Sequence, residues 1–453
     1  MSKYEMDMTE GHIGKKLLIF SIPLILSTIL QLAYNAFDII VLGKLVNYES
    51  MAAVTSTGPL VALFTNFFLG LSVGCSVIMA RYYGAKDNTN ASKTLHTTIW
   101  ASIIIGIVVT ILGVSLSKGM LILSNTPDIL LGLSTTYLQI YFAGILFNIV
   151  YNFGSAILRA VGDTKRPLIY LAIAGVLNIG FNLLFVLVFD MGVAGVALGT
   201  IISEFVSALL VVITLCKSNG VLHLAFKELK MDKKILKDMI VIGLPAGIQS
   251  TVFNVSNVII QSKINSFGEI AIAGNGAAGN LEGFIYASIS SVYQGVISFT
   301  SQNYAVGKMK NIKKTLYFSY LYATLFSLLL GGICLVFSKQ LLFLYNENTE
   351  VISIGRERLL WLGLVYPLCG FMDCTSGLLR GIGKSNLSML MTIVGVVGFR
   401  ITWVYSFFNL NPTLTNLYIS YPISWTITWL CELAVFIYLY KKLSNNKKLN
   451  IGE

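Results

Sequence analysis

Charged side chains are scarce in this chain: Asp, Glu, Lys and Arg together make up 12% of its 453 residues. A typical soluble domain carries about 25%, so there is too little charge here to cover a water-soluble surface. Apolar residues make up 55% of the chain, and the mean hydropathy is +0.75. This composition excludes an ordinary soluble protein and predicts an all-α polytopic protein embedded in a lipid bilayer.

Residues and motifs typical of catalysis are missing as well. The three histidines, His12, His96 and His223, are too dispersed in the sequence for a zinc site. The six cysteines fall in apolar stretches or at their ends without Cys-x-x-Cys spacing, which favours packing over metal binding or redox chemistry. No loop has the Gly-x-x-x-x-Gly-Lys-Ser/Thr spacing that binds nucleotide phosphates. We therefore expect no cofactor and no enzymatic activity.

Long apolar stretches take up most of the chain. About twelve of them have roughly 20 residues or more, which is enough to cross a hydrocarbon core of ~30 Å as a helix. They lie at 17–43, 53–80, 95–117, 129–158, 167–189, 193–216, 238–262, 272–302, 315–337, 353–379, 387–409 and 413–440.

The basic residues are concentrated on one side of these spans. Of the 32 Lys and Arg residues, 25 lie in the two tails and in the turns after the second, fourth, sixth, eighth and tenth spans. Because basic loops stay on the cytoplasmic side, both termini are expected in the cytoplasm, with the protein in the cell membrane. The net charge of +11 then reflects membrane orientation, and no nucleic-acid partner is expected.

A short motif divides the chain into two halves. Leu158-Arg159-Ala160-Val161-Gly162 returns as Leu379-Arg380-Gly381-Ile382-Gly383, and the two arginines are 380 − 159 = 221 positions apart. Six spans in each half make the two halves parallel repeats. Between them lies a polar linker that we expect to carry a short amphipathic helix on the inner membrane surface. The predicted parts are a tail (1–16), an N-lobe (17–216), the linker (217–237), a C-lobe (238–440) and a second tail (441–453).

Polar residues inside the N-lobe spans fall at similar depths. A charged side chain in a membrane helix is costly unless it is paired or faces water, so each such residue is a functional candidate. Asp38 lies in the outer half of the first span, and Tyr137, Asn178, Asn182 and Thr200 reach comparable levels. We predict that these five residues form one cluster in which Asp38 binds H⁺ or Na⁺. The alternative is a network that only joins helices.

The C-lobe contains different charged residues. Glu282 and Arg400 lie at similar depths in the eighth and eleventh spans, and they are predicted to pair, for structure or for transport. Asp373 in the tenth span is a further candidate, as are Glu204 in the sixth span and Glu432 in the twelfth.

Two prolines occupy matching places in the repeat. Pro23 lies early in the first span and Pro245 early in the seventh. Proline inside a helix removes a backbone hydrogen bond and favours a kink. The kinks are either static or a paired bending element.

Several of these stretches carry a resemblance to a known family. Ile22-Pro23, the run from Gln31 to Asp38, the sequence Ala80-Arg81-Tyr82-Tyr83-Gly84-Ala85 and the paired Leu-Arg-x-x-Gly turns are similar to those of multidrug and toxic compound extrusion (MATE) transporters. The similarity covers roughly residues 12–440. It implies two six-helix bundles facing each other in a V, with alternating access driven by Na⁺ or H⁺.

Within that family the chain looks closer to the DinF-like branch. There, an Asp in the first helix, fifteen residues after a Pro, couples the cation, and Pro23 and Asp38 have this spacing (38 − 23 = 15). The branch's polar partners fall on Tyr137, Asn178 and Thr200. The chain departs from the pattern at Asn182, where the branch commonly has an Asp.

The sequence is therefore interpreted as that of a secondary active exporter. Amphipathic, cationic organic compounds are the expected small-molecule substrates, exchanged for H⁺ or Na⁺ by a protein expected to be monomeric. The alternative on the related fold is a flippase for a lipid-linked saccharide or cell-wall precursor, although a single mid-span arginine suits a pyrophosphate poorly. A membrane enzyme is not favoured, because the chain lacks a cluster of catalytic groups at one depth. A channel would be distinguished by single-channel currents without ion exchange.

Overall fold

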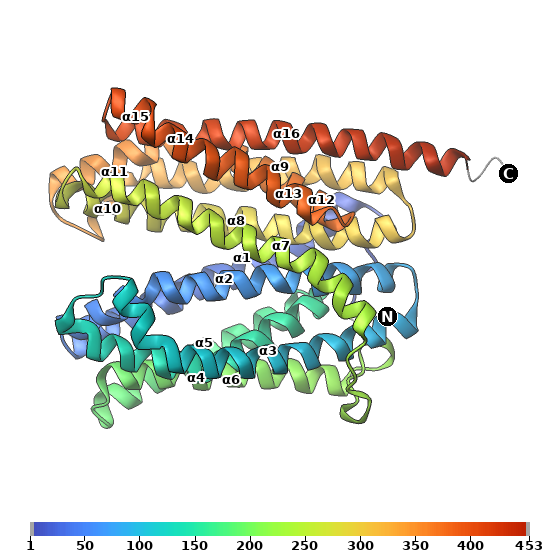
Figure 1. The fold of residues 1–453 in the computed structure, drawn as a ribbon, viewed down its shortest axis with the longest axis horizontal. Coiled ribbons are helices and arrows are strands. Elements are labelled where there is room, and N and C mark those ends of the chain that lie inside the picture. Colours follow the sequence, from blue (N-terminus) through green and yellow to red (C-terminus); the bar gives the residue numbers. More distant parts are fainter. Residues whose placement is uncertain (1–3, 450–453) are drawn as a thin grey trace. The chain divides into compact units, whose positions relative to one another are not determined.

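Helices make up the fold, which a computed structural model describes for residues 4–449 (Figure 1). No strand is assigned within that range. The α-helices are α1 (Ile13–Leu45), α2 (Tyr48–Gly84), α3 (Asn88–Leu123), α4 (Asp128–Ala160), α5 (Lys165–Leu183), α6 (Gly192–Lys217), α7 (Lys233–Asn265), α8 (Glu269–Ala305), α9 (Met309–Val336), α10 (Ser338–Phe343), α11 (Thr349–Leu362), α12 (Tyr366–Gly381), α13 (Ser385–Thr392), α14 (Phe399–Tyr405), α15 (Phe407–Leu410) and α16 (Leu414–Leu449). Two π-helical turns, η1 (Leu184–Val188) and η4 (Ile393–Gly398), continue α5 and α13.

The prediction of a polytopic all-α membrane protein is confirmed. In the described part of the chain, 10 helices are long and apolar enough to cross a membrane. Helices α11 and α12, bent by 52° at their junction, meet the same criterion only when they are taken together. The eighth predicted span is the 37-residue helix α8, which is not among these 10 helices. It is long enough to cross a membrane, but its many Gly, Ser and Asn residues make it less apolar. Its small and polar residues suit packing against protein more than contact with lipid.

The helices form two compact units, whose boundaries fall inside α1 and α7. Unit 1 contains residues 1–6 and 26–247, and unit 2 contains 7–25 and 248–453. Pro23 and Pro245 each lie inside their helix, three residues before the chain passes from one unit to the other (26 − 23 = 3 and 248 − 245 = 3). These packing units are defined by contacts, and the lobe ranges given above stay a prediction.

The repeated Leu-Arg-x-x-Gly motif is a helix ending. Gly162 follows α4 with φ +95°, and Gly383 follows α12 with φ +85°, a conformation that glycine adopts without strain. The residue after each glycine closes the turn: Asp163 N donates to Leu158 O at 3.0 Å, and Lys384 N donates to Leu379 O at 2.7 Å. This six-to-one bond is typical of the glycine C-cap that satisfies the last helical carbonyls. The motif therefore recurs because the same helix must end at the same place in each half.

The linker differs from its prediction. No amphipathic α-helix forms between α6 and α7; the segment instead has two 3₁₀ turns, η2 (Gly220–Leu222) and η3 (Phe226–Glu228). Its backbone is held by α3, where His96 Nε2 accepts from Ala225 N at 3.2 Å and Thr97 Oγ1 accepts from Asp232 N at 3.1 Å. These side-chain bonds satisfy backbone amides that a helix would otherwise pair internally, so the linker stays extended.

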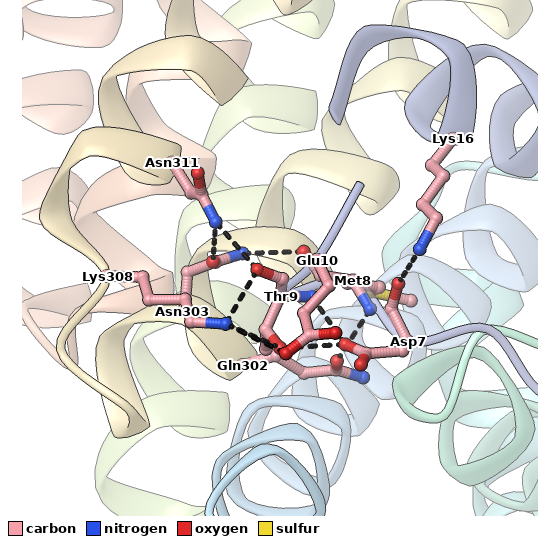
Figure 2. A network of polar contacts seen from close by, with 9 residues as sticks. All are labelled: Asp7, Met8, Thr9, Glu10, Lys16, Gln302, Asn303, Lys308 and Asn311. Atoms are coloured by element: carbon pink, nitrogen blue, oxygen red, sulfur yellow. Dashed lines mark hydrogen bonds and ion pairs between the residues drawn. The ribbon is translucent and has the colours of Figure 1, made fainter. Parts of the chain in front are cut away.

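The segment before α1 packs on the turn between α8 and α9 (Figure 2). Gln302 Oε1 accepts from Met8 N at 3.2 Å, and Asn303 Nδ2 donates to Met8 O at 2.9 Å. Burial raises the pKa of the Asp7 carboxyl, but hydrogen bonds from Thr9 and the nearby charges of two lysines outweigh burial and hold that pKa below its usual value. The turn thus fixes the backbone that leads into α1. Further bonds to Thr9 O come from Lys308 Nζ and Asn311 Nδ2.

Candidate functional site

Three helices of unit 1 converge on the Asp38 carboxylate. Asp38, on α1, is 7% exposed, and its Oδ1 accepts from Asn182 Nδ2 of α5 at 2.5 Å. Its Oδ2 accepts from Thr200 Oγ1 of α6 at 3.3 Å. Asn178, one turn before Asn182, donates from Nδ2 to Thr200 Oγ1 at 3.3 Å and accepts from Asn182 at 3.3 Å. The structure thus brings four of the five predicted N-lobe residues into one hydrogen-bonded cluster.

Tyr137 is the fifth residue of that prediction. It is buried on α4, with 7% of its surface exposed, but no hydrogen bond joins it to the cluster among the described residues. A count of residues along the span gives no information on rotation about α4, which decides whether the Tyr137 side chain reaches the cluster.

The cluster has no basic member and leaves one oxygen free. Within the part of the chain that the structure describes, Asn182 Oδ1 is buried without a hydrogen-bond partner. When a buried carboxylate has only an amide and a hydroxyl as partners, most of the free-energy cost of burying its negative charge remains, because neither partner is charged. Binding of a proton or a monovalent cation would remove that cost, and Asn182 Oδ1 offers an additional oxygen ligand.

Close helix contact positions Asn182. A Cβ on Gly199 would lie 2.2 Å from Asn182 Oδ1, so glycine at this place in α6 lets α5 approach. The π-helical turn η1 begins two residues after Asn182. Such turns are rare and frequently occur at functional sites, because they interrupt the regular hydrogen-bond ladder.

The predicted Glu282–Arg400 pair is wrong. Glu282 of α8 pairs with Arg358 of α11 instead, through Nε to Oε1 at 2.8 Å and Nη2 to Oε2 at 2.9 Å. Tyr366 OH also donates to Glu282 Oε2 at 3.1 Å, and Arg358 Nη1 donates to Asn275 Oδ1 at 3.1 Å. Arg358 lies five positions after the start of the predicted span 353–379 (358 − 353 = 5), yet it is only 9% exposed. Its position on the α8-facing side of α11 explains the pairing.

Arg400 has neutral neighbours. Its Nε donates to Ser424 Oγ at 3.1 Å, its Nη1 donates to Asn257 Oδ1 at 3.2 Å, and its guanidinium lies 4.2 Å from the centre of the Tyr421 ring. Aromatic faces stabilise a buried cation through their quadrupole, which accounts for an arginine without an acidic partner here.

The remaining candidate carboxylates have different neighbours. Asp373 of α12 is half-buried beside the Tyr286 hydroxyl. Glu204 Oε1, on α6, accepts from Asn148 Nδ2 at 2.8 Å. Glu432 is fully buried on α16 among hydroxyl groups. Periodicity alone indicates none of these partners, because they come from helices far apart in the sequence.

Comparison with known proteins identifies the family. The MatE family profile matches residues 23–184 and 245–405, one segment in each half. The chain belongs to the MatE family. The two segments also account for the 221-residue repeat, since each half carries one copy of the family's domain.

Curated relatives and solved structures agree with this membership. The chain is 29% identical to "Probable multidrug resistance protein YpnP" of Bacillus subtilis over 88% of this chain and 90% of the relative. It is 24% identical to "Multidrug export protein MepA" of Staphylococcus aureus over 95% and 94%. A structure described as the outward-facing conformation of a multidrug resistance MATE family transporter has a TM-score of 0.91, at 22% identity, over 98% of this chain and 99% of that one. The fold is that of MATE transporters, and the chain is a multi-pass membrane protein.

Proposed function

We propose that this MatE protein exports amphipathic, cationic organic compounds in exchange for H⁺ or Na⁺, and that Asp38 binds the coupling ion. The observation that supports this most is the Asp38 cluster: a buried carboxylate held by Asn182 and Thr200, with no basic side chain in the cluster. An ion that neutralises Asp38 changes the cost of burying it, so ion binding and helix packing must be coupled.

Bending of α1 would transmit this change. Pro23 interrupts the hydrogen bonding of α1 on the same helix as Asp38, fifteen residues earlier, and Pro245 does the same in α7. Both prolines lie three residues before the chain passes between the two compact units. We propose that occupancy of Asp38 alters the bend at Pro23 and that alternating access follows from paired bending of α1 and α7.

Orientation and substrate class are further parts of the proposal. The concentration of basic residues in the tails and alternate turns supports cytoplasmic termini. The names of the relatives, multidrug resistance and multidrug export, support organic compounds as cargo. We propose a monomer as the transporting unit.

Transport in proteoliposomes tests the proposal. The purified protein is reconstituted, and efflux of a fluorescent amphipathic cation is followed under an imposed Na⁺ gradient, an imposed pH gradient, or neither. Exchange that depends on one of the two gradients supports coupling and identifies the ion. Equal efflux with and without both gradients would show that transport is not coupled to either cation.

A further inference from the structure

A second buried carboxylate lies in unit 2 within a cage of hydroxyl groups. Glu432, on α16, is 0% exposed. Its Oε1 accepts from Ser376 Oγ of α12 at 2.7 Å, from Ser388 Oγ of α13 at 3.4 Å and from Thr392 Oγ1 of α13 at 3.4 Å. Gln249 of α7 completes the cage: its Nε2 donates to Thr392 Oγ1 at 3.0 Å, and its Oε1 accepts from Ser388 Oγ at 3.5 Å. Four helices of one unit therefore contribute to the cage.

The hydrogen-bond inventory of this cage is incomplete. Glu432 Oε2 is buried and has no hydrogen-bond partner among residues 4–449. Each hydroxyl has a single proton, and Ser376 and Ser388 also bond each other at 2.8 Å, so the three hydroxyls cannot all donate to Glu432 at once. An ionised carboxylate with one oxygen unserved is costly at this depth.

The surrounding charges do not neutralise Glu432. Arg380 and Asp373 are two nearby charged residues, and their opposite charges act on Glu432 in opposite directions. The Arg380 guanidinium is engaged by the Tyr293 hydroxyl, and its centre lies 5.4 Å from the Tyr293 ring centre. No ion pair forms with Glu432 among the residues that the structure describes.

The geometry points to a second binding site for a monovalent cation, formed by Glu432 with Ser376, Ser388, Thr392 and Gln249. A proton would occupy Glu432 Oε2, or Na⁺ would be bound by the carboxylate, hydroxyl and amide oxygens, which are the ligands that hard cations prefer. Either ion neutralises the carboxylate and supplies the partner that Oε2 lacks. As a binding site the cage stands without the Asp38 cluster; as a site for a coupling ion it rests on the proposed export function.

Local backbone structure matches that of the Asp38 cluster. The π-helical turn η4 begins directly after Thr392, as η1 begins two residues after Asn182. In each unit, a residue that donates a hydrogen bond to the buried carboxylate is followed by a π-helical turn: Asn182 in unit 1 and Thr392 in unit 2. Such turns are rare and are frequently found at functional sites, which supports a binding role for both buried carboxylates.

Cation binding to the purified full-length protein tests the inference, with Na⁺ and H⁺ as the probes. Bound ²²Na⁺ per protein is counted at alkaline pH. Infrared difference spectra between about pH 6 and alkaline pH in Na⁺-free buffer report carboxyl groups that still hold a proton above the ordinary carboxyl range of about 4. Glu432→Gln is expected to lose one bound Na⁺ or one carboxylic acid C=O band, and the arm that responds names the ion. Glu357→Gln is the matched control, because its carboxylate bonds the Thr415 hydroxyl at 2.5 Å near the other end of α16. Glu357→Gln is expected to leave both readouts unchanged.

Asp38→Asn measured in parallel separates this inference from the proposed function. If Asp38→Asn keeps all cation binding while Glu432→Gln loses one cation, the cage stands and the role of Asp38 fails. If Glu432→Gln matches wild type in both arms, the cage is overturned. Should Glu432→Gln not fold, Ser376→Ala removes the 2.7 Å donor to Glu432 together with the 2.8 Å bond to Ser388. It is expected to lower the affinity for Na⁺, or to raise that for H⁺, about tenfold. Wild-type affinity in Ser376→Ala would overturn the inference equally.

Discussion

Breaking the Glu282–Arg358 pair should reveal whether Glu282 serves structure or transport. The carboxylate accepts three hydrogen bonds, from Arg358 Nε, Arg358 Nη2 and Tyr366 OH, and both charged partners are buried. Glu282→Gln leaves the Arg358 guanidinium buried without a counter-charge, and such changes cost about 3–5 kcal/mol. Arg358→Gln should cost less, because an unpaired Glu282 can take up a proton whereas arginine cannot lose one. The double variant should therefore be more stable than Glu282→Gln alone.

Thermal unfolding in detergent micelles measures these changes in stability. Glu357→Gln is the control and should change the free energy of unfolding by less than about 1 kcal/mol, because its carboxylate is partly exposed and has no ion-pair partner among the described residues. Transport by the same variants is followed in proteoliposomes. Wild-type stability of Glu282→Gln would refute the reasoning from burial. Wild-type stability combined with lost transport would show that Glu282 takes part in the transport cycle.

Three further predictions concern the site and the helix ends. Gly199→Ala should reduce coupled transport about tenfold or more with near wild-type stability, because the new Cβ displaces Asn182 and removes its bond to Asp38. Gly180→Ala is the control and should transport normally, because no atom lies within 4 Å of its new Cβ. Gly383→Ala should lower the free energy of unfolding by about 1–2 kcal/mol because φ is +85°, and an unchanged midpoint would contradict the cap assignment. Asp7→Asn should speed hydrogen exchange of the Thr9 amide at neutral pH, because that amide donates to the Asp7 carboxylate. Since the pKa of Asp7 lies below its usual value of 3.8, the stabilisation by this carboxylate is present above pH 3.8 and is lost as the pH falls further. An equal effect of Asp7→Asn at pH 7 and below that value would contradict this account.

Much of the fold follows from the sequence, because membrane helices must satisfy their own backbone and so appear as long apolar runs. The spans predicted at 95–117 and 193–216 correspond to α3 and α6. The linker was predicted less well, since its conformation depends on His96 and Thr97, side chains more than a hundred residues away. The bend between α11 and α12 was also not foreseen, although it lies inside a single apolar run.

Depth along a span can be read from the sequence, but rotation about the helix axis cannot. Counting residues placed Asp38, Asn182 and Thr200 at compatible depths, and the i, i+4 spacing put Asn178 and Asn182 on one face. The same counting paired Glu282 with Arg400, because it took no account of Arg358 as a buried residue. The Glu432 cage was missed as a set, since serine and threonine are too common in membrane helices to signal a site.

Gradient-driven exchange by Asp38→Asn tests the central claim most directly. The substitution keeps the shape of the side chain and removes the charge that binds the ion. Wild type and Asp38→Asn are reconstituted at equal density, with orientation and thermal stability checked, and substrate efflux is measured under separate Na⁺ and pH gradients. We expect Asp38→Asn to insert and fold normally but to show no stimulation by either gradient. Stimulation of Asp38→Asn at the wild-type rate would contradict the assignment of Asp38 as the coupling residue.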